Sequence, residues 1–384
     1  MVSKLKSSPS VGLITFHWAD NFGSVLQAYA LQETVRKLGF NVQIVDFRPT
    51  ALVDQYRISK PMRRNLKSIL KYCVKKILFD RKVEHKISRY EDFRRNFMYL
   101  SPKRFLSSED LKKNSPTYDI YLVGSDQVWN PSFVRDIGFS YLLDFLPPSA
   151  YKVSYASSVV EEIPDDFLPK YKYYLEQFRF ISVRERSSKE ILKKILDKPI
   201  EVCLDPVFLL SVEEWHNICE KPKRKVKKPY ILVLDYVVNE TYRSYVNLLS
   251  SRLGLPIVSF QDKLKMKLMR KGYSNHLCSI EFEGPREILW YIANAEIVLT
   301  SSFHGLAFAL IFNKKFVCMV HPTRGNRMID LLTDIKMERS LLHPNLPFEN
   351  IRNIEPVSLS EESYNILTRL KDRSLEYLKS ALRT

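Results

Sequence analysis

The segment VGLITFHWADNFGSVLQAYALQETVRKLGFNVQIVDF, residues 11–47, decides the fold class of this chain. Residues 11–16 form an apolar run, which predicts a buried strand, and residues 42–47 predict a second strand of the same kind. Between them, residues 24–37 carry apolar side chains at helical spacing. A strand, a helix and a strand in this order form a βαβ unit with parallel strands. The segment therefore predicts a Rossmann-like α/β sheet.

The loop after the first of these strands is rich in polar residues. Asn21 and Gly23 predict a turn, and Ser24 is the expected N-cap of the helix. A helix start at the carboxyl end of a strand is where open α/β sheets bind ligands. The spacing is not that of a GxGxxG dinucleotide fingerprint, so an ordinary first βα loop remains the alternative.

A second strand-to-helix segment, IVLTSSFHGLAFAL, occupies residues 297–310. Its apolar strand is followed by three hydroxyl residues, of which Ser302 can cap a helix, and Gly305 allows close backbone approach in the first turn. The unpaired N–H groups of such a turn face an anion. His304 lies among them and can donate a hydrogen bond, hold a charge or move a proton. A purely structural histidine is the alternative.

A third segment, YDIYLVGSDQVWNP at residues 118–131, places polar and aromatic groups directly after an apolar strand. Asp126 offers an acid or base, Gln127 and Asn130 offer amide groups, and the indole of Trp129 could stack on a sugar ring. The alternative is a packed Asx-type turn around a buried tryptophan.

Six motifs along the chain resemble the polysaccharide pyruvyl transferase family: HWADNFGSVLQAYALQ, VGSDQVWNP, SYASS, ISVRERSS, CLDPVFLL and SSFHGLAFAL. The resemblance runs from about Val11 to about Leu341. It implies an α/β fold of two Rossmann-like domains in a GT-B-like arrangement, with a cleft between them. It also implies transfer of a pyruvyl group from phosphoenolpyruvate to two sugar hydroxyls, which leaves a cyclic ketal and free phosphate. Phosphoenolpyruvate is then the donor substrate, and no cofactor is expected.

The donor carries a carboxylate and a phosphate on one small frame, and the planar fork of arginine pairs with both groups. Arg184 ends the apolar strand FISV and resembles the strand-end arginine of the family, while Arg327 precedes an apolar helix after the His304 segment. The expected donor-binding residues are Arg184, Ser302, His304, Gly305 and Arg327.

Ketal formation needs at least one general acid and one general base. We expect His304 and Asp126 to be the catalytic pair, with their two roles left open. Asp205 is expected to fix a turn before Pro206. The expected acceptor-binding residues are Asn21, Gln127, Trp129 and Asn130.

The length of 384 residues suggests two domains, at roughly 150 residues each. The charged stretch KPKRKVKK, residues 221–228, is the expected link. Residues 1–220 would form the acceptor-side domain, with a basic helical insertion at about 55–104. Residues 229–384 would form the donor-side domain, whose last helix, residues 361–382, could cross back to the first.

The net charge of +17 is concentrated in residues 55–104, which hold 16 Lys and Arg against 4 Asp and Glu. Apolar residues at helical spacing predict a basic amphipathic helix there. One hypothesis is that residues 63–82 rest on an anionic membrane surface, where a lipid-linked acceptor would be presented. The alternative is a helix packed on its own sheet. Nothing in the sequence resembles a nucleic-acid recognition motif, so no nucleic-acid partner is expected.

The five cysteines include no CxxC pair, and no acidic cluster is present, so neither a metal site nor disulfides are expected. Residues 1–10 are polar, and no apolar run reaches the length of a membrane span. We therefore expect a cytoplasmic protein that can touch the inner face of the membrane. The sequence carries no signal for the oligomeric state.

Two other functions fit the same sequence. A GT-B glycosyltransferase that uses a nucleotide-sugar would share the fold and the helix start for phosphate. A non-catalytic member could bind glycan or membrane through the basic segment. The acceptor sugar of a surface or capsular polysaccharide, and the position of the ketal on it, are left open by the sequence.

Overall fold

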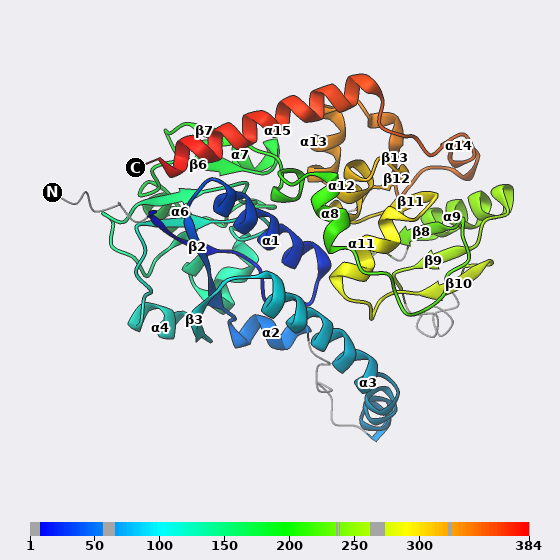
Figure 1. Cartoon of the computed structure of the whole chain (residues 1–384), viewed down its shortest axis with the longest axis horizontal. Helices are drawn as coiled ribbons and strands as arrows, with labels where there is room; N and C mark the ends of the chain where they lie inside the picture. The colour runs from blue at the N-terminus through cyan, green and yellow to red at the C-terminus, as the bar shows by residue number, and fades with distance from the viewer. Residues whose placement is uncertain are drawn as a thin grey trace. The chain divides into compact units, whose positions relative to one another are not determined.

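The computed structural model describes residues 8–56, 66–235, 237, 239–261, 273–321 and 325–383, and side chains at 54–80 and 348 lie outside this description. The chain forms two compact units (Figure 1). Unit 1 comprises Met1–Leu209 with Lys371–Thr384, and unit 2 comprises Leu210–Leu370.

The main sheet of unit 1 has five parallel strands in the order β3-β2-β1-β4-β5. These are β1 (Ser10–Ile14), β2 (Asn41–Phe47), β3 (Leu100–Phe105), β4 (Ile120–Val123) and β5 (Lys152–Ser154). A smaller parallel pair, β6 (Ile181–Val183) and β7 (Ile200–Val202), joins β5 through a bridge between Val153 and Phe180. Because the strands are parallel, their carboxyl ends meet at one side of the sheet, which we call the unit 1 edge.

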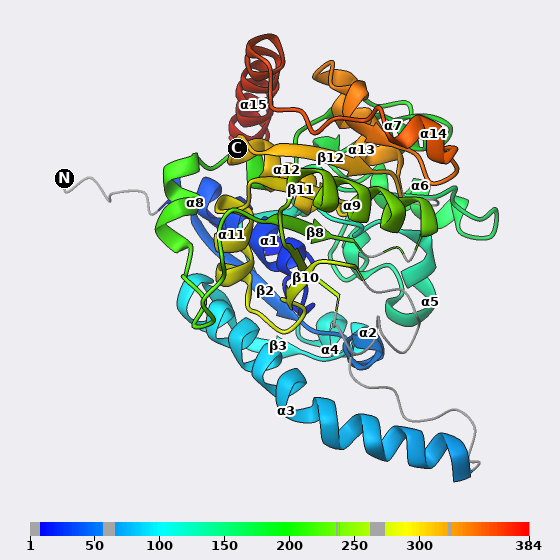
Figure 2. The same cartoon turned by 90° about the vertical axis from the view of Figure 1, so that its right-hand side faces the viewer.

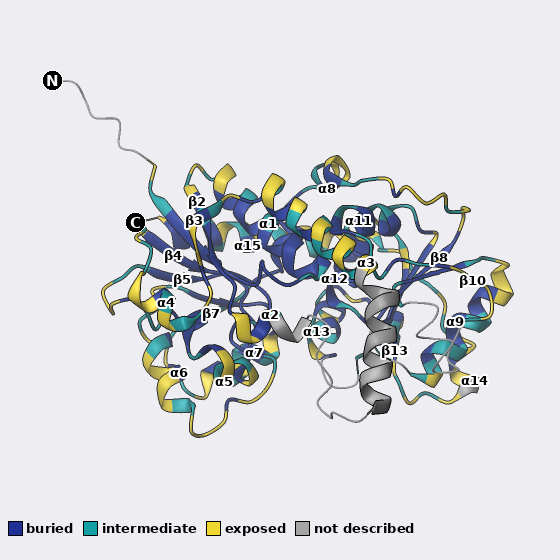
Figure 3. Ribbon diagram, turned by 90° about the horizontal axis from the view of Figure 1, so that it is seen from below, coloured by how far each residue is buried: buried dark blue, intermediate teal, exposed yellow. Residues whose placement is uncertain are grey.

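Helices cover the unit 1 sheet, and its strands β1, β4 and β5 are buried, whereas the outer strand β3 is partly exposed (Figure 3). The α-helices are α1 (Phe22–Lys37), α2 (Thr50–Tyr56), α3 (Leu66–Phe97), α4 (Ser108–Lys113), α5 (Val134–Ile137), α6 (Leu168–Leu175) and α7 (Arg186–Lys193). Short 3₁₀ turns are η1 (Pro131–Phe133), η2 (Ser140–Leu142) and η3 (Pro206–Phe208).

The N-cap expected for α1, Ser24, is wrong, because the helix begins three residues earlier. The helix begins at Phe22, and the side chain of Asn21 accepts a hydrogen bond from the backbone N–H of Gly23 at 2.9 Å. The hydroxyl of Ser24 donates instead to Asp126 at 3.0 Å. Asn21 has the extended backbone that an N-cap requires, so it takes the role that Ser24 was expected to have.

Unit 2 contains a sheet of six parallel strands in the order β10-β9-β8-β11-β12-β13. These are β8 (Ile231–Leu234), β9 (Ile257–Ser259), β10 (His276–Ser279), β11 (Ile297–Thr300), β12 (Lys315–Met319) and β13 (Leu341–Leu342). Its helices are α8 (Val212–Ile218), α9 (Glu240–Leu253), α11 (Pro285–Ala293), α12 (Phe303–Ile311), α13 (Asn326–Asp334), η4 (Glu338–Ser340), α14 (Phe348–Ile351) and the first part of α15 (Glu361–Leu382). The expected α/β class with two Rossmann-like sheets is confirmed.

The two units divide between Leu209 and Leu210, ahead of the link expected at residues 221–228. The reason is α8, which packs within unit 2: the ring of Trp215 meets that of Phe308 edge to face, with centroids 4.9 Å apart. The guanidinium of Arg286 also donates to the carbonyl of Ile218 at 2.8 Å. The charged stretch is therefore a loop inside unit 2.

The last part of α15, from Lys371, belongs to unit 1. There the hydroxyl of Ser374 accepts from the N–H of Leu204 at 2.9 Å, and the hydroxyl of Tyr377 donates to the carbonyl of Ser154 at 2.9 Å. Unit 1 is thus built from two separate stretches of the chain.

The basic segment contains the long continuous helix α3 (Figure 2). The side chains of most of the hypothesised membrane segment, residues 63–82, lie outside the described part of the chain. Across the described ranges, no helix combines the length and the hydropathy of a membrane span.

Candidate functional site

At the carboxyl ends of the strands of unit 2, which we call the unit 2 edge, β8 and β11 lie side by side, with Thr300 paired to Leu234. Asp235 follows β8, and Ser301 follows β11. The hydroxyl of Ser301 donates to the Asp235 carboxyl at 2.6 Å, and the N–H of Val237 donates to the same oxygen at 2.8 Å. Burial raises the pKa of Asp235 to about 6, against the effect of these two hydrogen bonds. A carboxyl that exchanges its proton near neutral pH therefore stands at this edge.

Helix α12 starts at the same edge. Ser302 is its N-cap, and its hydroxyl accepts from the N–H of Gly305 at 3.3 Å. A Cβ at Gly305 would lie 2.3 Å from the hydroxyl oxygen of Thr300, so the helix can approach β11 this closely only with glycine there. Gly305 has the role of close approach that the sequence predicts.

His304 lies in the first turn of α12 and is 7% exposed. Its ring meets the ring of Phe303 edge to face at 5.4 Å, and the Arg327 guanidinium lies over Phe303 at 5.8 Å from the ring centroid. Four of the five expected donor-binding residues thus come together around this turn: Ser302, His304, Gly305 and Arg327. The helix N–H groups, an imidazole and a guanidinium suit an anion.

The fifth expected donor residue, Arg184, lies at the unit 1 edge, directly after β6. Its buried guanidinium donates to Asp205 at 2.9 Å and to Glu185 at 3.4 Å, and lies 3.8 Å from the Asp126 carboxylate. Burial works against the charge, but the three carboxylates raise the pKa of Arg184. The guanidinium of Arg184 is therefore already paired with carboxylates of unit 1.

Asp126 adopts a left-handed backbone with φ of 74°, which is uncommon for a residue other than glycine. Its carboxylate accepts from the hydroxyl of Ser24 on α1 and from the N–H of Gln127. Asp205 accepts from the N–H of Val207 at 3.1 Å and caps η3, as the sequence predicts. Asp126 and Asp205 are therefore held around Arg184 by several elements of unit 1.

The expected acceptor residues lie in packed positions. Trp129 is 1% exposed, its indole N–H donates to the carbonyl of Tyr141 at 3.0 Å, and its ring packs against Phe178. It therefore offers no face to a sugar, which contradicts the expectation. Asn130 accepts from the N–H of Ser132 at 3.0 Å and begins η1.

Two acceptor candidates are only half-buried. Gln127 accepts from the side-chain amide of Asn130 at 3.3 Å, and Asn21 caps α1. The segment after β4 is therefore the Asx-type turn around a buried tryptophan that the sequence left as an alternative.

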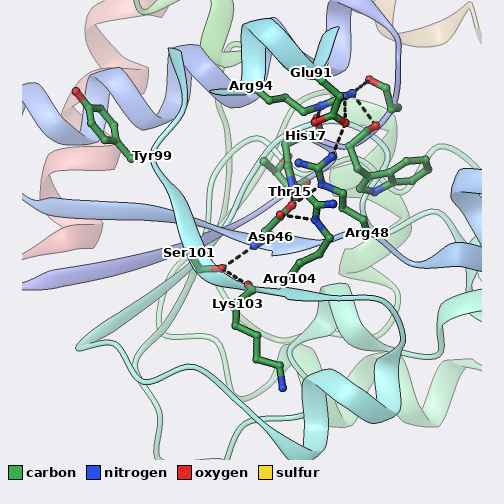
Figure 4. Close-up of polar contacts among 12 residues, drawn as sticks. Thr15, His17, Asp46, Arg48, Glu91, Arg94, Tyr99, Ser101, Lys103 and Arg104 are labelled. Atoms are coloured by element: carbon green, nitrogen blue, oxygen red, sulfur yellow. Dashed lines mark hydrogen bonds and ion pairs between the residues drawn. The ribbon is translucent and has the colours of Figure 1, made fainter. Parts of the chain in front are cut away.

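The sequence did not reveal a cluster of charges between β2, α3 and the loop after β1 (Figure 4). Arg94 of α3 is 1% exposed, and its guanidinium donates to the carbonyls of His17 at 2.7 Å, Trp18 at 2.6 Å and Ala19 at 2.9 Å. This one side chain fixes the backbone of the first βα loop. In the sequence, Arg94 is one of many basic residues of this helix, so nothing there predicted its buried position.

Asp46 on β2 is the centre of the same cluster. It accepts from Arg48 and, at 2.9 Å, from Arg104, and lies 2.9 Å from the imidazole of His17. Burial opposes ionisation, yet these partners lower the pKa of Asp46 below its usual range. Burial lowers the pKa of His17, against the effect of Asp46. The sequence did offer one signal of this cluster, because Asp46 is a charged residue within the apolar run of β2.

Residues 21–322 match the polysaccharide pyruvyl transferase family. Comparison of the sequence with curated proteins finds no match. The fold is similar to that of MnaA from S. aureus, solved with UDP, at 10% identity over 97% of each chain and a TM-score of 0.51. It is also similar to a Listeria monocytogenes protein described as a UDP-N-acetylglucosamine 2-epimerase, at 12% identity over 97% of this chain and 91% of that one, with a TM-score of 0.50.

A third solved structure, AviGT4, a glycosyltransferase involved in avilamycin A biosynthesis, matches at 9% identity over 98% of this chain and 99% of that one, with a TM-score of 0.49. At such identities the structural neighbours show the fold alone, which this chain shares with the S. aureus and Listeria monocytogenes proteins. The family match is different, because it covers well over half of the chain. This protein belongs to the polysaccharide pyruvyl transferase family.

Proposed function

We propose that this protein transfers the pyruvyl group of phosphoenolpyruvate to two hydroxyls of one sugar, forming a cyclic ketal and releasing phosphate. The first turn of α12 carries the proposal, because Ser302, His304 and Gly305 gather there with Arg327 beside Phe303. Membership of the pyruvyl transferase family supports the same reaction.

The donor phosphate would bind at the first turn of α12, where backbone N–H groups and the positive end of the helix dipole favour an anion. Arg327 supplies a planar cation for the second anionic group of the donor. Arg184 has a different role in this proposal. Three carboxylates surround it, and an approaching dianion would meet excess negative charge. We assign Arg184 the positioning of Asp126 and Asp205.

The reaction takes up two protons and releases two. The methylene carbon of the donor takes one proton from a general acid, and the departing phosphate takes another. The two sugar hydroxyls lose one proton each as they form carbon–oxygen bonds to the former enol carbon. His304 and Asp126 remain the proposed acid and base, and Asp235 is added as a candidate acid because burial raises its pKa to about 6.

Thermal denaturation with phosphoenolpyruvate tests the donor site. At roughly 100 times its Kd, the donor should stabilise the native protein by about 2.7 kcal/mol. We expect His304→Ala and Arg327→Ala to abolish the shift and the phosphate release seen with a saccharide acceptor. Arg339→Ala, an exposed arginine of unit 2, is the matched control and should keep the shift. Stabilisation by a nucleoside diphosphate but not by phosphoenolpyruvate would indicate a glycosyltransferase, and no response to either would indicate a non-catalytic member.

We further propose that the acceptor is a lipid-linked precursor of a surface or capsular polysaccharide, met at the inner face of the membrane. The basic sequence of residues 63–82 supports this setting. Vesicles with and without anionic lipid test it by co-sedimentation. Sedimentation that does not depend on anionic lipid would rule out an electrostatic membrane contact.

A further inference from the structure

A cavity of about 170 Å³ lies in unit 1, beside the charge cluster of Figure 4. It opens where β1, β2 and β3 end, at the unit 1 edge. The polar and aromatic residues that line it come from the loop after β1, the end of β2, the start of α2, α3 and β3: Trp18, Asp20, Arg48, Thr50, Glu91 and Arg104.

Hydrogen bonds fix the charged groups of this cavity in place. Arg48 donates to both Asp46 and Glu91, and its side chain is only 9% exposed. Arg104 donates to the other oxygen of Asp46 at 2.9 Å. Arg94 donates to the backbone carbonyl of Trp18 and to the side-chain carboxylate of Asp20. The lining is therefore ordered before any ligand enters, which lowers the entropic cost of binding.

The charges of the cavity cancel. Its described lining holds two guanidiniums, of Arg48 and Arg104, and two carboxylates, of Asp20 and Glu91. Behind them, the carboxylate of Asp46 lies 2.9 Å from the imidazole of His17, and Arg94 donates to the backbone carbonyl of the same histidine. Such a cavity gives no net attraction to an anion or a cation. It offers many donors and acceptors of hydrogen bonds, which suits a ligand with several hydroxyls.

Shape and position agree with a sugar. The volume is below the roughly 300–1,000 Å³ of pockets for drug-sized molecules. Val53, Ile87 and Leu106 also line the cavity and give it an apolar part, against which the C–H groups of a sugar ring can pack. In the sheet, β1 lies between β2 and β4, so the cavity and Asp126 flank the loop after β1 at the same edge.

We propose that this cavity binds one neutral monosaccharide unit of the acceptor glycan, next to the unit that reacts near Asp126. The proposal rests on the proposed function, because it gives the acceptor a second point of contact.

Saturation-transfer NMR with methyl glycosides of neutral hexoses tests the cavity directly. We expect saturation transfer to neutral glycosides and none to glucuronic acid or a hexose phosphate. Arg104→Gln and Glu91→Gln should each weaken binding about tenfold, since each removes a hydrogen bond from a charged group. Arg95→Gln and Glu84→Gln are matched controls, because both residues are exposed on α3 and neither lines the cavity.

The phosphoenolpyruvate shift of each variant separates this proposal from the proposed function. We expect both cavity variants to keep that shift, which also shows that they fold. Loss of sugar binding with the donor shift retained supports the cavity. Equal sugar binding by wild type and both cavity variants would contradict sugar binding in this cavity and leave the donor site intact. Preferential binding of charged sugars would contradict it in the same way. A wild type that binds sugar but ignores phosphoenolpyruvate would overturn the proposed function alone.

Discussion

The unit 1 edge and the unit 2 edge belong to the same kind of parallel sheet but carry different chemistry. At the unit 1 edge, charged side chains are paired with one another: Arg184 with three carboxylates, and Asp46 with two arginines. At the unit 2 edge, the described groups around α12 are hydroxyls, helix N–H groups, an imidazole and the nearly buried carboxyl of Asp235. Charged side chains that pair with one another hold loops in place and do not attract a further ion, whereas hydrogen-bond donors that point at one place suit an anion.

The largest expected effect is a loss of stability on removing a charged side chain from the unit 1 edge, compared with the unit 2 edge. Arg184→Ala leaves three buried carboxylates without their counter-ion, and we expect a loss of about 3–5 kcal/mol in the free energy of unfolding. His304→Ala should cost far less stability and abolish donor binding. Urea denaturation of both variants measures this, with Arg186→Ala, exposed at the start of α7, as the control. An Arg184→Ala variant with normal stability and no donor binding would make Arg184 a donor ligand.

The second effect concerns the opposite pH response of the two edges. The pKa of Asp235 is higher in the native state than in the unfolded chain, so the native state binds its proton more tightly. The stability that this proton contributes to the free energy of unfolding is therefore lost as pH rises from about 4 to about 6. At about 1.4 kcal/mol per pKa unit, this amounts to about 3 kcal/mol. Asp46 has a lowered pKa, so its contribution is lost only in acid below about 4.

Free energies of unfolding measured from about pH 2 to pH 7 test this difference, because this range covers the decline due to Asp235 and the acid-side loss due to Asp46. We expect Asp235→Asn to remove the decline between pH 4 and pH 6 and to leave the acid-side loss unchanged. An identical pH profile in the wild type and the variant would show that Asp235 does not hold a raised pKa.

The third effect is a steric one at the unit 2 edge. Gly305→Ala places a Cβ against Thr300, and we expect it to cost about 1–3 kcal/mol and to weaken phosphoenolpyruvate binding. The double variant Gly305→Ala with Thr300→Ala removes the clashing hydroxyl and should recover part of the donor affinity. Thermal denaturation and donor titration measure both quantities. A fully stable Gly305→Ala variant would mean that α12 does not need its close approach to β11.

The smallest effect compares the two N-caps. Asn21→Ala and Ser302→Ala each remove one side-chain acceptor from a helix start, at about 1 kcal/mol of stability. We expect only Ser302→Ala to weaken phosphoenolpyruvate binding, because only α12 carries the proposed donor site. Equal effects of the two variants on donor binding would remove the distinction between the edges.

The sequence predicted what depends on local pattern. Apolar runs gave the strands and their parallel order, and the spacing from Ser302 to Gly305 gave both the cap and the close approach of α12. The choice between Asn21 and Ser24 as cap failed because both are good cap residues within one turn of each other. The expected link at residues 221–228 failed because a run of charges is equally typical of a loop on the surface of a unit.

What the sequence could not predict depends on contacts between distant residues. The core position of Trp129 is set by Tyr141 and Phe178, which no local pattern around the strand end reveals. The contact between Arg94 and His17 joins residues 77 positions apart. Within a basic helix, one buried arginine has the same spacing as its solvated neighbours, so only the fold distinguishes it.

The discontinuous make-up of unit 1 has a consequence for synthesis on the ribosome. Unit 2 is one continuous stretch of chain, so it can fold as soon as it has emerged. Unit 1 emerges first but waits for its last segment, because Leu204 and Ser154 find Ser374 and Tyr377 only when the carboxyl-terminal residues have been made. The part of the protein translated earliest is thus the last to be completed, and a nascent chain halted before residue 371 would combine an unfinished unit 1 with a finished unit 2.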